Sequence, residues 1–579
     1  MSSRRRWITA SLVALAVILV FSAVWVGVRG TFAKGELEAA MAEVPTMKSQ
    51  LLSGDLHGAR TTIATVAHHL EETHQLTSDP VWRAAEWFPF LGKNLTAVRE
   101  LAEVGASLSD NALVPIGGLA DSLDPAALKP VDGQLDVKKL ADAVPIVQAA
   151  AKNISTDLAV VKAIDVQGAV QQVVDAQMKL SSMLTTAAPL ANQAADAIAA
   201  VPGLLGADGP RNYLVVFQNN AEARSLGGHA GSMALISAID GKIALVKQGN
   251  VHDFPTYASP IVPIPSDALQ LWGDGIATNA SNITELPRLD LSAETARQFW
   301  NLTFGVQADA VIFLDPVALG YLLAATGPVQ VPTGDELTSA NAAQFLLNGV
   351  YLKYPNSVDQ DAVLDATTTQ TFASIATGSF DPVKLIEAAV QSGKDHRLLV
   401  WSFDERERSV LARTPFDLAT PATDDKKASF GIYVADNLGS KMTYYMNQSV
   451  ALGTSQCSAG GSEYRVAFTV TNTVPPGAGA DLPDYVAEGA EGAFRILVTL
   501  YAPPGSTELS ADGNASEYDP IRGTDGDYPA IQVRLVLAPG ETKTITFAAR
   551  AADDLKRDLD AYVTPLATPT PIGPLTFTC

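Results

Sequence analysis

The sequence predicts a multidomain protein with an N-terminal transmembrane helix, a membrane-proximal helical region, an α/β central domain and a C-terminal β-sandwich. Three observations predict this order. An uncharged run at residues 8–28 follows three arginines, apolar residues recur at helical spacing to about residue 201, and strand-like runs separated by turn residues fill much of the rest. We place the boundaries at 1–33 for the cytoplasmic stub and anchor, 34–205 for the helical region, 206–413 for the α/β domain and 414–579 for the sandwich.

The N-terminal run is long enough to be a membrane anchor. At about 1.5 Å rise per residue, residues 8–28 cover the ~30 Å hydrocarbon core of a bilayer. A secretory signal has a shorter apolar core followed by a small-residue cleavage site, so we expect an uncleaved anchor. Arg4, Arg5 and Arg6 should stay in the cytoplasm by the positive-inside rule. The expected location is therefore the cell membrane, crossed once, with the bulk of the chain extracytoplasmic.

Charge and cysteine content limit the partners. The net charge of −22 repels phosphate backbones, so no nucleic-acid partner is expected. Cys457 and Cys579 are the only cysteines, too few for a tetrahedral zinc site by themselves. In an oxidising compartment they would form one disulfide, and the alternative is two unpaired thiols.

The helical region breaks at residues 53–55, 77–80 and 115–118, where turn residues gather. It forms either a stalk beside the membrane or a set of helices packed on the next domain. Trp82, Trp87 and Phe88 lie close together in the segment 82–92. These aromatic residues either rest on lipid headgroups or form a knot in the helical core.

The two later regions differ in periodicity. Runs at 213–217, 232–238, 242–247, 310–314 and 398–403 read as strands, and helical patterns at 292–304, 316–325, 341–351 and 362–376 interleave with them. Asp315 and Pro316 form a helix start signal. Further on, runs at 444–451, 463–473, 494–501, 531–537 and 543–549 are typical of a β-sandwich.

One motif carries a family resemblance. Residues 212–224, NYLVVFQNNAEAR, followed by GGHAGS at 227–232, resemble the hallmark of domain-of-unknown-function family number 4012. His229 stands where that family usually has an aromatic residue. Residues 79–82, 89–92, 309–319 and 325–329 match further, so the resemblance runs from the aromatic segment to the sandwich. It implies a bacterial envelope protein with an N-terminal anchor, and it implies architecture rather than activity.

The order of elements is also similar to the LytR-CpsA-Psr family of cell-wall ligases. Those enzymes transfer glycopolymers from polyprenyl pyrophosphate to peptidoglycan, with arginines on the pyrophosphate and aspartates on magnesium. Glu222-Ala223-Arg224 would take the place of their D-x-R loop, and residues 325–329 that of a G-G-V turn. The aspartate expected near Ser232 is absent here.

The loop and its surroundings contain groups suited to phosphate. An arginine can bind phosphate bidentately, and glycines allow turns that point N–H groups at an anion. The candidate ligand-binding residues are Asn220, Glu222, Arg224, Gly227, Gly228, Ser232 and Arg288, with Asp253 and Asp290 as weak candidates for Mg²⁺. The structural alternative is that Arg224 pairs with Glu222 and the glycines only shape the loop. His229 and His252 are expected to be structural rather than metal ligands.

Two functions follow. The first is a non-catalytic envelope protein that binds a cell-wall glycan, a polyprenyl-linked glycopolymer or another protein. The second is a LytR-CpsA-Psr-like phosphotransferase that attaches lipid-linked glycopolymer to the cell wall. No catalytic residue is assigned, and no cofactor is expected beyond Mg²⁺ under the second hypothesis.

Overall fold

The computed structural model describes residues 2–89, 91–120, 129–131, 133–331, 334–417, 420–457, 461–512, 519–553 and 556–579. Phe90, in the aromatic segment, lies outside the described residues. The chain forms two compact units: unit 1 contains Met1–Pro130 and Leu135–Asp208, and unit 2 contains Val131–Gln134 and Gly209–Cys579. Each unit has its own apolar cores, so the multidomain prediction holds at this coarse level.

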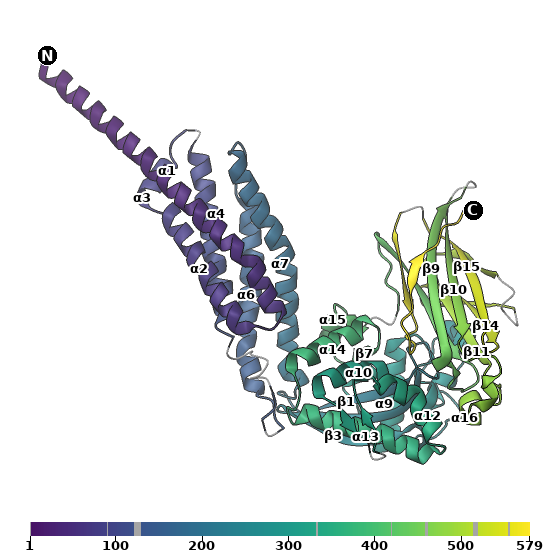
Figure 1. The fold of residues 1–579 in the computed structure, drawn as a ribbon. Helices are drawn as coiled ribbons and strands as arrows, with labels where there is room; N and C mark the ends of the chain where they lie inside the picture. Colours follow the sequence, from purple (N-terminus) through teal and green to yellow (C-terminus); the bar gives the residue numbers. More distant parts are fainter. Residues whose placement is uncertain are drawn as a thin grey trace. The chain divides into compact units, whose positions relative to one another are not determined.

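Unit 1 is helical throughout its regular structure (Figure 1). Its elements are α1 (Ser2–Leu52), α2 (Leu56–Thr77), α3 (Pro80–Ala85), α4 (Gly92–Leu108), the π-helix η1 (Ser109–Leu113), α5 (Val114–Gly117), α6 (Val137–Ala163) and α7 (Gln171–Leu204). The predicted breaks at 53–55 and 77–80 are confirmed. The break near 115–118 is confirmed as well, because the helix ends at Gly117 with Gly118 as its C-cap, although residues 114–117 are still helical.

The anchor and the first helix of the helical region are one element. The sequence analysis separates them at residue 33, but α1 runs on without interruption and carries Pro45 inside it. None of the residues of its apolar run, 8–28, is buried in the structure. Among the described residues, α1 is the one helix long and apolar enough to cross a membrane, and by length and composition it fits an anchor or a signal sequence.

Capping aspartates and small residues explain how the helices start and pack. Asp55 and Asp136 accept hydrogen bonds from backbone N–H groups three residues on, which satisfies donors that the helix itself leaves free. Many buried residues of unit 1 are alanines, and small side chains allow close approach of neighbouring helices. Examples are Ala59, Ala97, Ala102, Ala143, Ala150, Ala151, Ala188 and Ala195.

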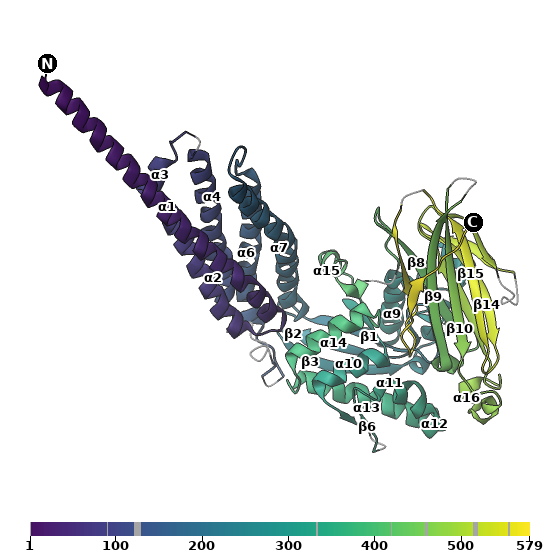
Figure 2. The same ribbon diagram turned by 45° about the horizontal axis from the view of Figure 1, so that its top comes forward.

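Unit 2 begins with a five-stranded mixed sheet in the order β3-β2-β1-β4-β7 (Figure 2). Its strands are β1 (Arg211–Asn219), β2 (His229–Ile239), β3 (Lys242–Asn250), β4 (Ala310–Leu314) and β7 (Leu398–Ser402). β1 and β4 are parallel, and the other neighbours are antiparallel. All five strands predicted from the sequence for this region are confirmed.

Successive residues of β1 enter different cores because side chains alternate across a strand. Leu214 and Val216 pack with Phe299 and Trp300 of α9 (Leu289–Phe304). Val215 packs on the opposite face with Ala318 of α10 (Pro316–Thr326). The other α-helices and strands described here are α8 (Ser266–Trp272), β5 (Val329–Gln330), β6 (Glu336–Leu337), α11 (Ala342–Gln344), α12 (Val350–Lys353), α13 (Ser357–Ala376), α14 (Pro382–Lys394) and α15 (Glu405–Leu411), and the π-helix η5 (Phe345–Gly349) joins α11 to α12.

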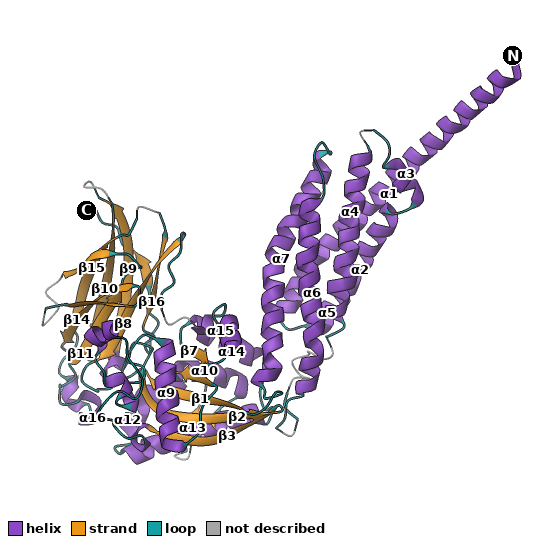
Figure 3. Ribbon diagram, turned by 180° about the vertical axis from the view of Figure 1, so that it is seen from behind, coloured by secondary structure: helices purple, strands orange, loops and turns teal. Residues whose placement is uncertain are grey.

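The rest of unit 2 consists of two five-stranded sheets packed face to face, and we call it the sandwich (Figure 3). One sheet has the order β12-β15-β10-β9-β17 and the other β13-β14-β11-β8-β16. The elements are β8 (Lys427–Asp436), β9 (Met446–Gln456), β10 (Ser462–Asn472), α16 (Asp484–Ala487), β11 (Phe494–Tyr501), β12 (Thr507–Asp512), β13 (Ile521–Asp525), β14 (Tyr528–Leu537), β15 (Thr542–Arg550), β16 (Asp558–Val563) and β17 (Ile572–Pro574).

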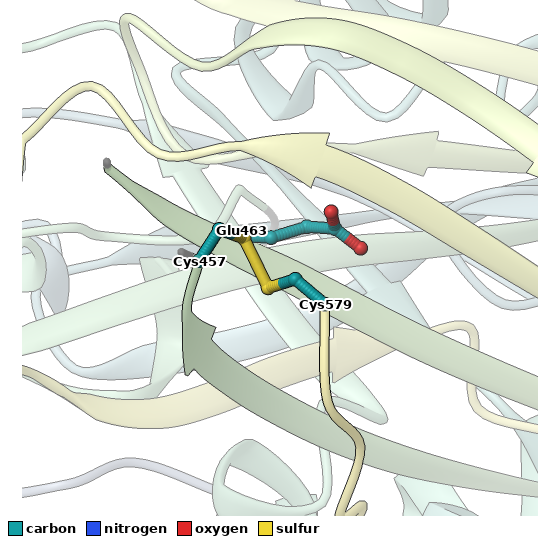
Figure 4. Close-up of side chains that lie close together, drawn as sticks. All are labelled: Cys457, Glu463 and Cys579. Atoms are coloured by element: carbon teal, nitrogen blue, oxygen red, sulfur yellow. A yellow bond between two sulfur atoms is a disulfide. The ribbon is translucent and has the colours of Figure 1, made fainter. Parts of the chain in front are cut away.

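Cys457 and Cys579 form a disulfide with a Cα–Cα distance of 5.2 Å (Figure 4). The pairing predicted from the sequence is therefore present. The short strand β17, which is parallel to β9, brings the C-terminal tail to the end of β9. Glu463 lies beside the two sulfurs. Because both sulfurs are bonded to each other, neither is a thiolate available to a metal ion.

Candidate functional site

The loop that joins β1 to β2 contains most of the candidate residues, and two of its glycines are required by its shape. Gly227 has a φ of +138°, a conformation that side chains disfavour. A Cβ on Gly228 would lie 2.2 Å from the backbone carbonyl carbon of Asn219. The loop therefore folds back tightly on the end of β1.

Several N–H groups in and beside the loop donate to backbone carbonyls. Gly227 N donates to the carbonyl of Arg224 at 2.8 Å, and Leu226 N donates to that of Thr284 at 3.2 Å. His229 N donates to the carbonyl of Glu222 at 2.8 Å. These three donors are already used, which weakens the prediction that the turn presents N–H groups to an anion.

Arg224 lies in the middle of a buried charge cluster. One terminal guanidinium nitrogen contacts Glu222 at 2.8 Å, and Nε contacts Glu285 at 2.7 Å. The other terminal nitrogen donates to the backbone carbonyls of Ala223 at 3.0 Å and Asp436 at 3.4 Å. Glu222 also pairs with Lys441. Both terminal nitrogens have hydrogen-bond acceptors, and Nε lies in an ion pair with Glu285 although it makes no hydrogen bond. A phosphate would therefore have to displace a carboxylate.

Burial and charge shift the titration of this cluster. Burial raises the pKa of Glu222, but His229, Lys441 and Arg224 outweigh it and lower that pKa to about 2. Burial raises the pKa of Glu285 and of Asp436. Burial also lowers the pKa of His229 to about 4, so Lys441 and Arg224 supply the positive charge at neutral pH.

The same loop is hydrogen-bonded to the sandwich. Ala223 N donates to the hydroxyl of Thr443 at 2.8 Å, and that hydroxyl donates to the carbonyl of Ala221 at 2.7 Å. Asp436 N donates to the carbonyl of Ala223 at 2.8 Å. The side chain of Asn220 donates to the carbonyl of Pro565 at 2.9 Å. Ala223 also belongs to the apolar core of the sandwich. The loop is therefore a joint between the mixed sheet and the sandwich.

We expect Thr443→Val to destabilise unit 2 by about 1–3 kcal/mol, because valine cannot accept the buried Ala223 N–H. Urea unfolding followed by tryptophan fluorescence measures the loss. Thr544→Val is the matched control, since Thr544 is exposed on a strand of the same sandwich. Equal urea midpoints for the two variants would contradict the role of the loop as a joint between the mixed sheet and the sandwich.

Arg288 lies in a different charge group. Its guanidinium contacts Asp290 at 3.1 Å and Asp525 of the sandwich at 3.0 Å. Tyr501 donates to Asp525 at 2.7 Å, and Trp272 donates to Tyr501 at 2.9 Å. Asp525 is buried. These contacts therefore form a second polar link, which joins Trp272 and Arg288 to the sandwich.

The remaining candidates have ordinary structural places. Ser232 lies in β2 between Phe217 of β1 and Asn250 of β3. Asp253 accepts from Asn250 N at 2.8 Å and caps a short turn. Within the part of the chain that the structure describes, neither Asp253 nor Asp290 belongs to a group of three ligand-type side chains. The two weak magnesium candidates are thus not brought together into such a group.

Several residues of these clusters were not found from the sequence. Glu285, Asp436, Lys441, Thr443 and Asp525 supply the partners of the candidate arginines and of the loop. Lys441 is 219 positions from Glu222, and no local pattern marks such a pairing. Residues 525–527 contain a turn signal, Asp-Gly-Asp, but nothing in it indicates that Asp525 is buried.

A shallow depression of about 740 Å³ lies elsewhere in unit 2. It is lined mainly by the apolar segment Pro260, Ile261, Val262, Pro263 and Ile264, with Leu269, Gly273 and Asp274. None of the candidate residues lines it.

The described residues define a class of chain: an N-terminal helix long and apolar enough to cross a membrane, a helical unit, and a mixed sheet joined to a sandwich through a buried polar loop. Residues 208–351 match the model of a family described as a protein of unknown function, DUF4012. This match supports the resemblance carried by residues 212–232, over a shorter stretch than expected. No curated protein matches the chain. The likeness to LytR-CpsA-Psr ligases gains no support from these comparisons and stays a prediction.

His229 is expected to make stability depend on pH. Its pKa is about 4 in the folded chain and about 6.5 when unfolded, so the unfolded state binds the proton more readily between these values. Stability from this residue is full above pH 6.5 and falls as the pH drops towards 4. We expect wild type to lose about 2 kcal/mol relative to His229→Gln between pH 7 and 5. If the free energies of unfolding of wild type and His229→Gln changed in parallel between pH 7 and 5, this expectation would be refuted.

Proposed function

We propose that the chain is a non-catalytic protein of the bacterial cell envelope, anchored by α1, with unit 2 outside the cytoplasm and binding an envelope component. The observation that carries the proposal is the apolar run of α1 at residues 8–28, none of which is buried in the described structure. A helix that exposes so much apolar surface is unfavourable in water and favourable in a bilayer.

Charge supports the orientation. Residues 4–6 are arginines before the apolar run, and Arg29 follows it. Arg29 contacts Asp79 at 2.9 Å and donates to the backbone carbonyl of Leu76. Its charge is therefore balanced locally, so the cluster at residues 4–6 is the larger positive charge beside the apolar run and favours a cytoplasmic N-terminus.

The disulfide supports an oxidising compartment for the sandwich. Bonds of this kind persist outside the cytoplasm and are rare within it. Growing cells treated with a thiol-alkylating reagent provide the test. We expect no modification of the native chain without prior reduction, and modification of Cys579 in Cys457→Ser. Alkylation of both native cysteines in untreated cells would place the sandwich in a reducing compartment.

The ion pairs of the candidate arginines argue against a phosphotransferase role. Arg224 and Arg288 each contact two carboxylates already, and each is part of a link to the sandwich. A phosphotransferase needs arginines that are free to stabilise charge on phosphate. The cell-wall glycan, the polyprenyl-linked glycopolymer and another envelope protein are the proposed partners.

Binding of polyprenyl pyrophosphate separates this proposal from the ligase hypothesis. The full chain in nanodiscs is titrated with the lipid, with and without Mg²⁺, and compared with Arg288→Ala. We expect Mg²⁺ and Arg288→Ala to leave the binding unchanged. Affinity that rises with Mg²⁺ and falls at least tenfold in Arg288→Ala would favour the ligase.

A further inference from the structure

The turn between α3 and α4 exposes large apolar side chains. Trp87 is 90% exposed, Leu91 63% and Phe88 42%. Trp82 of the same segment is 2% exposed and donates to the carbonyl of Leu95. The aromatic segment therefore divides: Trp82 belongs to the helical core, and the other three residues face outward. A patch of large apolar side chains on a water-facing surface indicates an interaction site.

The turn is ordered by its own backbone. Phe88 N donates to the carbonyl of Ala85 at 3.1 Å, and Gly92 N donates to that of Phe88 at 2.9 Å. A Cβ on Gly92 would lie 1.9 Å from the carbonyl oxygen of Glu86, so only glycine fits there. The exposed side chains are thus presented on a fixed turn.

Contacts with α1 place this turn at the end of the apolar run. Asp79 caps α3 and contacts both Arg29 at 2.9 Å and Trp25 Nε1 at 3.5 Å. The ring of Trp82 lies 3.7 Å from the position of a Cβ on Gly30. The uncharged run ends at residue 28, so α3 packs where α1 would leave the hydrocarbon. Figures 1 and 3 show the turn at the end of unit 1 from which the N-terminal half of α1 projects.

The charges around the turn are paired with one another. Glu86 is turned inward, where it contacts Arg99 at 2.7 Å. The exposed Arg83 and Lys93 lie 4.0 Å from Glu103 and 3.5 Å from Asp165, and their apolar stems can lie along a lipid surface beside the turn. The second connection at this end, between α6 and α7, adds Val170, which is 53% exposed.

We propose that Trp87, Phe88 and Leu91 of the α3–α4 turn insert into the headgroup layer of the bilayer that α1 crosses. This inference rests on the anchoring role proposed above. Trp87 and Phe88 supply amphipathic and apolar rings of the kind found at membrane interfaces, and Leu91 adds aliphatic surface. The turn is a second contact with the lipid, and it fixes the tilt and rotation of unit 1 relative to the membrane.

Spin-label accessibility in the full chain tests the proposal. The native cysteines are bonded to each other, so a nitroxide attaches only to an introduced cysteine. Leu91→Cys labels the turn, and Leu190→Cys labels a site that is 60% exposed on α7, about 30 Å along the helix from Val170. The chain is placed in nanodiscs of phosphatidylcholine and phosphatidylglycerol, and relaxation by oxygen is compared with relaxation by a water-soluble nickel chelate.

We expect the ratio of oxygen to nickel accessibility at position 91 to exceed that at 190 at least threefold. Equal ratios at 91 and 190 would overturn the inference. A third label, Leu15→Cys in the apolar run, separates the two proposals. An accessibility ratio typical of lipid at position 15 together with one typical of water at position 91 refutes only the insertion of the turn. A ratio typical of water at position 15 refutes both the anchor and the insertion of the turn.

Discussion

Arg224→Ala is expected to destabilise unit 2 by roughly 3–5 kcal/mol, the usual cost of removing one partner from a buried ion pair. The substitution leaves Glu222 with Lys441 alone and leaves Glu285 without its arginine. It also removes donors from the carbonyls of Ala223 and Asp436, where the loop meets the sandwich. A loss of this size is a large fraction of the stability of a typical domain, about 5–15 kcal/mol.

Urea unfolding of the full chain in detergent measures this effect, with Trp272, Trp300 and Trp401 as reporters in unit 2. Arg406→Ala is the matched control, because Arg406 is exposed on α15 and a surface change usually shifts stability by less than about 0.5 kcal/mol. Arg224→Lys should lie between the two, since an ammonium keeps the charge but not the planar set of donors. A loss in Arg224→Ala no greater than the control's would show that the cluster is not structural.

Loss of the disulfide is expected to cost the sandwich about 4 kcal/mol. The bond joins cysteines 122 positions apart, and the restriction that it places on the unfolded chain grows with loop length. In the folded chain it holds a tail whose other attachments include Leu575 N on the carbonyl of Leu452 at 2.7 Å and Arg465 over the ring of Phe577.

Cysteine-to-serine variants provide an internal control for this prediction. Cys457→Ser, Cys579→Ser and the double variant each remove the same bond, so all three should lose the same amount. Thermal unfolding of the oxidised chain measures it, and reduced wild type should match the variants. A double variant as stable as oxidised wild type would show that the bond contributes nothing.

The strands of the mixed sheet could be predicted because their signals are local. β1 is a short apolar run, and Asp240-Gly241 marks the turn between β2 and β3. β8 was missed, although it lies inside a sheet and most of its residues are buried. Its sequence does not alternate between apolar and polar residues. It also contains Gly431, a residue type that is uncommon in strands, because the ring of Tyr433 occupies the space where a Cβ would be.

The helical region was predicted in type but not in continuity. No proline lies between residues 28 and 44, Gly30 and Gly35 are tolerated within the helix, and the helix continues through Pro45. Gly30 has a packing role, since Trp82 lies against it. Which aromatic residues would be buried depended on the fold of the α3–α4 turn, and composition alone does not determine that.

The site was predicted only in part. The motif at 212–232 covers β1 and the loop that follows it, and the ion pair between Glu222 and Arg224 is the one that the structural alternative predicted. The loop's role as a joint could not be predicted, because Asp436 lies 212 positions from Arg224 and Thr443 lies 220 from Ala223. Contacts at such separations depend on how the sandwich packs against the loop, and the spacing of apolar residues in the sequence does not predict that.

Surface labelling of intact cells tests the membrane orientation on which the proposed function depends. Ile521→Cys, in the sandwich, and Ser3→Cys, before the apolar run, are treated separately with a membrane-impermeant maleimide. We predict that the cysteine at position 521 reacts in intact cells and that the one at position 3 reacts only after permeabilisation. Reaction at position 3 in intact cells, with position 521 protected until permeabilisation, would contradict the account.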